Sequence, residues 1–206
     1  MRTRALGFPD PPGSYPSLFD QDEGYHLRPA REIQNRAAVL NIVVARTFGM
    51  PASLGKHWVA DNGLVGALSP IEAELMDDAD ASKPRFQAQI EALWALTWVL
   101  GLTPSLDPTA YCEASLSESL PDLRTGAGVE AWRGRLGPIR NADDVMTELD
   151  LLYCLTWGLA EANLHGTEPP GTVEQYIHWE RRRALEWVLV ERGYGATEWD
   201  HIDVST

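Results

Sequence analysis

Three ten-residue windows of this chain align without gaps and share one pattern of acidic, leucine and tryptophan positions. The windows are EALWALTWVL from Glu91, DLLYCLTWGL from Asp150 and ERRRALEWVL from Glu180. Each begins with an acid, has Leu at its sixth and tenth positions and has Trp at its eighth. Residues seven apart in an α-helix lie on one face, ~10.5 Å apart, so each acid and its Trp point the same way. The pattern predicts three packed helices.

The composition permits a substantial core. Of the 206 residues, 44% are hydrophobic, and a chain of this length buries roughly 70% of its unfolded surface. The 8 Trp exceed ordinary usage and need packed surroundings. From Ala92 to Leu102 only Thr97 is polar, so the first window belongs to a helix buried nearly all round. We predict an all-α fold, a single-domain helical bundle with about five main helices.

Apolar residues at helical spacing, together with start and stop residues, define these five helices. A capping box begins the second helix at Ser69 and Glu72, and another begins the fifth at Thr172 and Gln175. The first helix begins near Pro29, a residue suited to a helix start. The predicted ranges are 29–48, 69–76, 84–100, 138–165 and 172–192.

The remaining segments are predicted to be mostly irregular. Residues 1–27 are rich in Pro, Gly and Asp and indicate an irregular N-terminal arm whose aromatic side chains pack on the body, residues 28–206. Residues 50–68 indicate a loop or short turn that carries Trp58. Residues 103–136 indicate a long, partly ordered connection with one or two short helical turns. The C-terminal tail has no helical period.

The charge of the chain restricts its partners. A formal net charge of −13 opposes binding to a polyphosphate backbone, so we expect no nucleic-acid partner. An acidic surface could steer a basic protein toward this one, although a generally solvated surface explains the same charge. No run approaches the ~20 apolar residues of a membrane span, and the N-terminus lacks the apolar region of a signal peptide. We therefore expect no membrane partner and a cytoplasmic location.

The three acids are the part of the repeated pattern that packing does not require. A carboxylate on a face that buries Trp must find a partner or raise its pKa. Two interpretations of Glu91, Asp150 and Glu180 stay open: a structural ion-pair cluster, which we favour, and a ligand or catalytic cluster. The available cationic partners on or beside the predicted helices are Arg36, Arg140 and Arg181.

One further acid joins this set. Trp199 indicates that the C-terminal tail docks on the body, because an indole seldom stays in water. A docked tail would bring Asp200 near whichever arginine the body offers, and a solvated acidic tail is the alternative. The candidate polar cluster therefore consists of Glu91, Asp150, Glu180, Arg181, Arg36 and Asp200.

Metal binding and covalent chemistry have weaker support. Glu174 and His178 are four residues apart, which puts both on one helix face and makes them weak metal candidates. Chance surface pairs at this spacing are frequent, and we expect no metal and no cofactor. Cys154 falls in an apolar helical pattern and is expected to be buried, whereas Cys112 is an ordinary loop cysteine. The chain has neither a phosphate-binding glycine loop nor the turn that exposes a nucleophilic serine.

Five segments in order carry a resemblance to a known family. They are RAAVLN from Arg36, EALWALTWVLG from Glu91, DLLYCLTWGLAEA from Asp150, ERRRALEW from Glu180 and WDHIDVST from Trp199. Together they resemble the bacterial family called domain of unknown function 4272 over about residues 30 to 206. The resemblance implies a mostly helical protein and no established activity. It also implies three departures from the family pattern, which has Arg, Asn and Asp where this chain has Cys154, Glu186 and Ser205.

Two hypotheses of function follow. The leading one is a non-enzymatic protein-interaction module of the adaptor or toxin-neutralising type, because the surface is acidic and recognised catalytic motifs are missing. The other is an enzyme or small-molecule sensor that uses a buried carboxylate and arginine cluster, with or without a metal.

Overall fold

The computed structural model describes residues 2–19, 24–78, 83–126, 128–168, 174–192 and 195–204. The chain is mostly helical, which confirms the predicted all-α class. Its elements in order are α1 (Arg2–Ala5), β1 (Tyr25–Leu27), α2 (Ala30–Thr47), α3 (Ala52–Asp61), η1 (Val65–Ala67), α4 (Pro70–Asp77), α5 (Pro84–Val99), η2 (Ala114–Ser119), α6 (Val129–Arg133), α7 (Ala142–His165), α8 (Gln175–Val188), β2 (Leu189–Glu191) and η3 (Trp199–His201).

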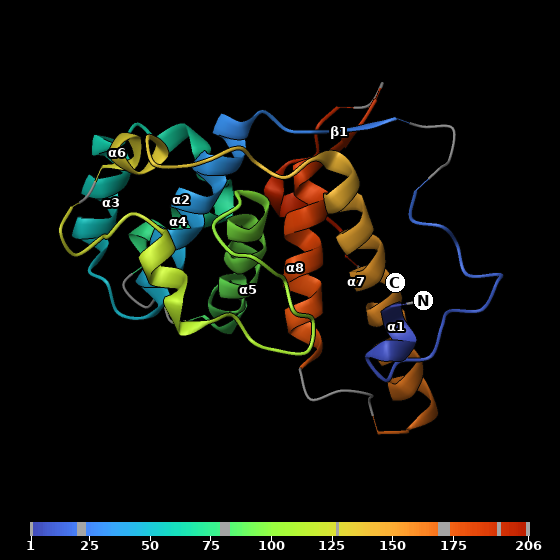
Figure 1. The fold of residues 1–206 in the computed structure, drawn as a ribbon. Helices are drawn as coiled ribbons and strands as arrows, with labels where there is room; N and C mark the ends of the chain where they lie inside the picture. Colours follow the sequence, from blue (N-terminus) through green and yellow to red (C-terminus); the bar gives the residue numbers. More distant parts are fainter. Residues whose placement is uncertain are drawn as a thin grey trace.

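Four long helices form the body of the protein. Figure 1 shows α2, α5, α8 and α7 side by side in that order, and the most extensive helix contacts are those of α5 with α8, α2 with α5 and α7 with α8. The leucines at the sixth position of the three windows, Leu96, Leu155 and Leu185, are fully buried. Residues 92–99 of α5 are buried on every side, as the nearly continuous apolar run predicts.

Local sequence signals set several of the helix ends. The capping box at the start of α4 is confirmed: Ser69 Oγ accepts from the Glu72 amide, and the Ser69 amide donates to Glu72 Oε2. α7 begins with an Asn141 cap on the Asp144 amide and ends at His165, as predicted. α8 begins at Gln175 with Glu174 at its N-cap, so the predicted capping box with Gln175 at its third helical position is wrong; Thr172 itself lies outside the described residues.

The structure corrects two sequence-based expectations. Residues 52–61 form α3 instead of a loop, because Trp58 and Val59 are buried in the core and anchor this segment against α2. The last helix was predicted to reach Arg192, but α8 ends at Val188. Residues 189–191 leave the helix to form β2, which pairs antiparallel with β1 with Leu27 opposite Leu189.

The N-terminal arm docks on α7 and contains the short elements α1 and β1 within an otherwise irregular path. Phe8 is buried against Leu151, Leu155 and Leu159 of α7. Gly158 permits this approach, since a Cβ there would lie 3.0 Å from Phe8 Cδ1. Farther along the arm, the Tyr15 ring stacks on Tyr153, with 4.8 Å between ring centroids.

The long connection and the tail follow expectation. Residues 103–136 contain only η2 and α6 as regular elements among the described residues. Trp199 is buried and contacts Trp187 edge to face, with 5.9 Å between ring centroids, so the tail docks. Among the helices of the described residues, none combines the length and apolar character that crossing a bilayer requires.

Candidate functional site

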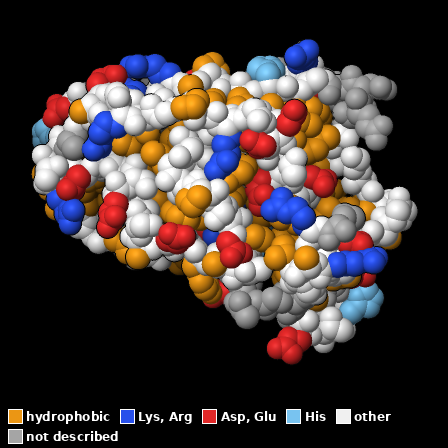
Figure 2. Space-filling model, in the orientation of Figure 1, with side chains coloured by type: hydrophobic (Ala, Val, Ile, Leu, Met, Phe, Trp, Pro, Cys, Tyr) orange, Lys and Arg blue, Asp and Glu red, His pale blue; other side chains and the backbone are white. Residues whose placement is uncertain are grey.

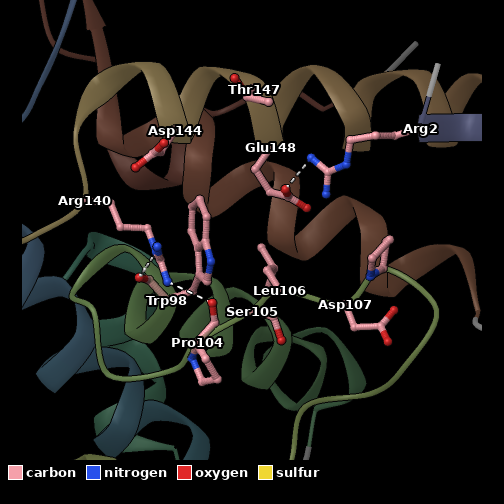
Figure 3. Close-up of a pocket in the computed structure, with 11 residues that line it drawn as sticks. Arg2, Trp98, Pro104, Ser105, Leu106, Asp107, Arg140, Asp144, Thr147 and Glu148 are labelled. Atoms are coloured by element: carbon pink, nitrogen blue, oxygen red, sulfur yellow. Dashed lines mark hydrogen bonds and ion pairs between the residues drawn. The ribbon is translucent and has the colours of Figure 1, made fainter.

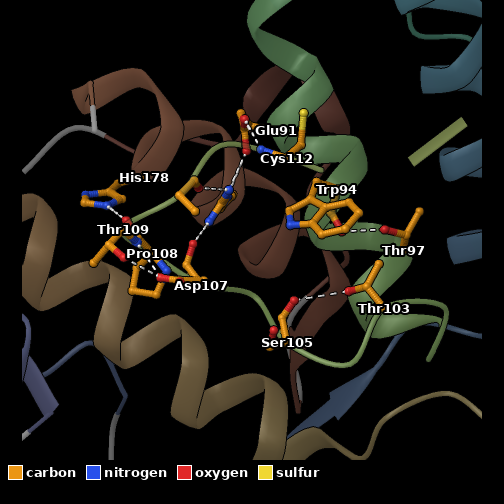
Figure 4. Close-up of polar contacts among 12 residues, drawn as sticks. Glu91, Trp94, Thr97, Thr103, Ser105, Asp107, Pro108, Thr109, Cys112 and His178 are labelled. Carbon is orange, nitrogen blue, oxygen red and sulfur yellow. Dashed lines mark hydrogen bonds and ion pairs between the residues drawn. The ribbon is translucent and has the colours of Figure 1, made fainter. Parts of the chain in front are cut away.

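A fully enclosed ion pair joins α5 to α8. Arg181 donates through Nε and Nη2 to Oε2 of Glu91, at 2.9 and 2.7 Å, and both side chains are enclosed at 0% and 1% exposure. The remaining atoms of the pair bind backbone rather than solvent. Arg181 donates to the carbonyls of Asp107 and Ala110, and Glu91 Oε1 accepts from the Cys112 amide at 2.8 Å (Figure 4). The pair therefore fixes the loop 107–112 onto the bundle.

His178 holds the same loop one turn away on α8. Its Nε2 donates to the Pro108 carbonyl at 2.8 Å, which leaves Nδ1 unprotonated and without a partner. Burial lowers the pKa of His178, and the nearby Arg181 adds to the effect, so the imidazole is neutral at pH 7. Glu174, the other half of the predicted metal pair, is exposed. Within the described ranges no three His, Cys, Asp or Glu side chains are grouped to hold a metal ion.

Arg140 anchors residues 103–104, which precede the loop 107–112, to the end of α5. Its Nε donates to the Trp98 carbonyl, and its Nη2 donates to the carbonyls of Thr103 and Pro104. Its guanidinium also lies over the Trp98 ring, 4.4 Å from the centroid. Carbonyls at a helix C-terminus lack helical partners and attract cations. Arg140 thus accounts for the path of the chain from α5 into the loop.

The anchored loop forms one wall of an open hollow of about 530 Å³. Residues 104–108 line one side, and α7 lines the other with Asp144, Thr147 and Glu148 (Figure 3). Arg2 reaches in from α1, and Trp98 and Arg140 complete the lining. We call this space the α7–loop hollow. Its polar lining and its size suit a small ligand or a side chain of a partner.

Glu148 is the buried charge of the hollow. Its side chain is only 8% exposed, and Oε2 accepts from Arg2 Nη1 at 2.9 Å. Oε1 is enclosed and has no hydrogen-bond partner. Arg2 is 55% exposed and is therefore held far less firmly than the carboxylate it contacts. A buried carboxylate with one unpaired oxygen is unusual, because unpaired buried charge costs free energy.

The lining of the hollow contains more acidic than basic side chains. The pKa of Asp107 is lowered by hydrogen bonds from the Thr109 hydroxyl and amide, so its carboxylate is ionised at pH 7. Asp144 lies one turn before Glu148 on the same face of α7. Asp107, Asp144 and Glu148 thus face two arginines, Arg2 and Arg140, of which Arg140 is already bound to carbonyls.

The three repeated acids have separate surroundings. Glu91 is paired in the core, whereas Asp150 is exposed on α7, contrary to the expectation that each acid lies on a buried face. Glu180 is buried at 7% exposure, and the nearest cation, Arg183 Nη1, is 3.4 Å away. Burial raises the pKa of Glu180 to about 7, and Arg183 offsets only part of that effect. Of the acids, only Glu91 pairs with one of the predicted arginines.

Arg36 and Asp200 line a second hollow, of about 300 Å³, beside the start of α4. Arg36 donates to Glu72 Oε1 at 2.5 Å and lies over the Trp199 ring, and Asp200 accepts from the Ile71 amide at 3.4 Å. The polar partners of Arg36 and Asp200 therefore differ, and Arg36 does not belong to the Glu91 cluster.

Sequence reasoning named Arg140 as a cationic partner but missed Arg2 and the three acids of the α7–loop hollow. Glu148 carried a usable signal, since it lies between Val145 and Leu152 at helical spacing and so shares their buried face. Arg2 is 146 residues away from Glu148, and Asp107 lies in a loop without periodicity. Helical patterns therefore predict neither the contact of Arg2 with Glu148 nor the position of Asp107.

The comparisons with known proteins complete this description. The profile of a family described as Domain of unknown function (DUF4272) matches residues 2–202. The chain belongs to this family. No curated protein and no solved structure matches the chain. The DUF4272 match begins at Arg2, the first residue of α1, so the matched region includes the N-terminal arm.

Cys154 and Glu186, two of the positions at which the resemblance implies a departure from the family pattern, lie outside the lining of the hollow. Cys154 is a buried residue of α7, and burial raises the pKa of its thiol to about 11. Glu186 accepts from Arg182 at 2.5 Å, four residues earlier on α8. Ser205 lies outside the described residues. Neither of the two described positions lines the α7–loop hollow.

Proposed function

We propose that this DUF4272 member is a non-enzymatic interaction domain of the bacterial cytoplasm that binds a basic protein partner, in the manner of an adaptor or a toxin-neutralising protein. The partner inserts a cationic side chain into the α7–loop hollow. The observation that carries the proposal is Glu148, a carboxylate that is 8% exposed, lies in an open hollow and has one unpaired oxygen. Neither nucleic acid nor a membrane is expected as a partner, given the net charge of −13.

The distribution of charge supports a local site over a general acidic surface. On the face shown in Figure 2, acidic side chains are spread over the molecule with basic ones among them. Scattered exposed charges speed association but contribute little affinity, whereas a desolvated carboxylate forms strong, specific contacts with a cation. Recognition is therefore expected to depend on the hollow.

The groups suited to acid–base or covalent chemistry support a non-enzymatic role. Glu91, Arg181 and His178 are enclosed and bound to one another or to backbone of the loop. Burial raises the pKa of the Cys112 thiol to about 12, and its contact with Glu91 adds to the effect, so this thiol is protonated at neutral pH. These groups hold the loop that forms a wall of the hollow, and none of them lines it.

The test compares two charge-matched triple variants in affinity capture from the native host at moderate salt. The first variant, Asp107→Asn with Asp144→Asn and Glu148→Gln, removes the acids of the hollow. The second, Glu113→Gln with Glu118→Gln and Asp143→Asn, makes the same change in net charge at exposed sites. We expect the wild-type chain and the second variant to retain a stoichiometric basic partner that the first variant loses.

Two results would contradict this proposal. One is an inert monomer that retains no partner in repeated captures. The other is a partner retained equally by both triple variants, which would place the interface outside the hollow.

A small-molecule sensor is the second candidate, favoured by the volume of the hollow, which lies in the range of about 300–1,000 Å³ typical of ligand pockets. A thermal-shift screen of small cationic compounds tests it. The sensor predicts a stabilising compound whose effect disappears in Glu148→Gln while the Glu118→Gln control keeps it.

A further inference from the structure

We infer that the Glu148 subsite of the α7–loop hollow takes an arginine guanidinium of the partner, and that Arg2 occupies this subsite as a stand-in when the partner is absent. The inference rests on the proposed function and names the chemistry that the hollow recognises. It starts from one contact: within the same chain, a guanidinium already binds the buried carboxylate, with 2.9 Å between Arg2 Nη1 and Glu148 Oε2.

The Arg2 side chain can leave without undocking the arm. The backbone of α1 is held by Thr3, which is 1% exposed and donates to Asp10 Oδ1 at 2.5 Å. Phe8 fixes the following turn on α7. Among the described residues, the one hydrogen bond of the Arg2 side chain is to Glu148, and the side chain is half exposed, so its rotation into solvent breaks a single polar contact there. Glu148 Oε2 is then free to accept from another donor.

A guanidinium from outside can bind better than Arg2 does. Arg2 is attached to α1 and reaches only Oε2, so Oε1 stays unpaired. A planar guanidinium that approaches freely can donate to both oxygens of one carboxylate, which is the strong geometry of arginine–carboxylate pairs. Asp144, one turn away on the same helix, supplies a second negative charge to the same ligand.

The same geometry selects arginine over lysine. An ammonium is a compact charge that cannot place two parallel N–H groups on the two oxygens, and it loses more hydration on entering the hollow. The Trp98 ring offers no additional stacking surface on its Arg140 side, because that guanidinium already covers it. Discrimination is therefore expected to come from the Glu148 oxygens.

The experiment titrates the full chain with N-acetyl-arginine amide, with the lysine amide, and with the citrulline amide as an uncharged isostere, followed by NMR or calorimetry. Three single variants are compared with wild type: Arg2→Ala, Glu148→Gln and Arg4→Ala. Arg4 is the matched control, since it lies on the same short helix but pairs with Asp10 and does not line the hollow.

We expect Arg2→Ala to bind the arginine amide about fivefold tighter than wild type. In wild type the amide must first displace the Arg2 side chain from Glu148, and the loss of that ion pair weakens binding by about this factor. Arg4→Ala should match wild type, Glu148→Gln should lose binding, and the citrulline amide should bind none of them. Equal affinity of Arg2→Ala and Arg4→Ala, or equal binding of the lysine and arginine amides, overturns the inference. If these titrations fail while the hollow-dependent capture succeeds, the proposed function stands and only the arginine assignment is wrong.

Discussion

Arg181 Nη2 lies 2.7 Å from Glu91 Oε2, and this pair, enclosed between α5 and α8, fixes the backbone of the loop 107–112. The contact explains how Glu91, one of the three acids of the repeated pattern, can be fully buried. It also links the core to the candidate site, because part of the loop that the pair holds is a wall of the α7–loop hollow. The carboxylate that faces a ligand is Glu148, on another helix.

Breaking the buried pair should destabilise the fold strongly. Glu91→Gln leaves the Arg181 charge buried without its partner and should lower the free energy of unfolding by about 3–5 kcal/mol. Urea denaturation measures this change. The exposed pair of Lys56 and Asp77 provides the control, since Asp77→Asn there should cost no more than about 1 kcal/mol. Equal effects of the two substitutions would show that the Glu91 pair is not the anchor described.

Stability should fall as pH rises from 4.5 to about 7 because of Glu180. Its pKa is raised from 4.5 to about 7 by burial, so the unfolded chain releases a proton that the folded chain keeps. Below pH 4.5 both states are protonated and above about 7 both are ionised, so the loss is confined to this window. The free energy of unfolding lost across this window is about 3 kcal/mol. Glu180→Gln should remove this component from urea denaturation curves across pH, whereas Glu118→Gln at an exposed site should retain it.

Gly101 should be intolerant of a side chain. Its φ of +72° is in the left-handed region, and a Cβ would lie 3.2 Å from the Pro138 carbonyl oxygen. Gly101→Ala should therefore lower the free energy of unfolding by about 1–2 kcal/mol. Gly137→Ala is the control, because open space surrounds that position and its φ is not positive. A neutral Gly101→Ala would contradict the close turn between α5 and the start of α7.

Local signals in the sequence were sufficient for most helices and failed where distant contacts decide. The Ser69 capping box needs only residues three apart, and it occurs as predicted. In contrast, Leu189 and Val190 continue a helical pattern, yet pairing with Tyr25–Leu27 draws them into a strand. The helix at 52–61 was missed because Gly55 lowers its intrinsic helix propensity, and tertiary packing of Trp58 compensates.

The candidate site was only partly predictable for the same reason. Glu91 and Arg181 stood out because a carboxylate on a Trp-bearing helix face requires a cation, and they do pair. Asp150 occupies the matching position in its window but is exposed, and Glu148, two residues earlier, is buried instead. Aligned sequence windows thus did not share one orientation in the bundle. The Arg2 contact depends on the docking of the arm and could not be read from helical periodicity.

Release of the captured partner by small ligands shows whether the partner occupies the α7–loop hollow. Wild-type protein holding its basic partner is washed with N-acetyl-arginine amide or with the uncharged citrulline amide at equal concentration. If a cationic side chain of the partner occupies the α7–loop hollow beside Glu148, the arginine amide releases the partner and the citrulline amide does not. Retention of the partner in both washes, or equal release by both, would contradict the account.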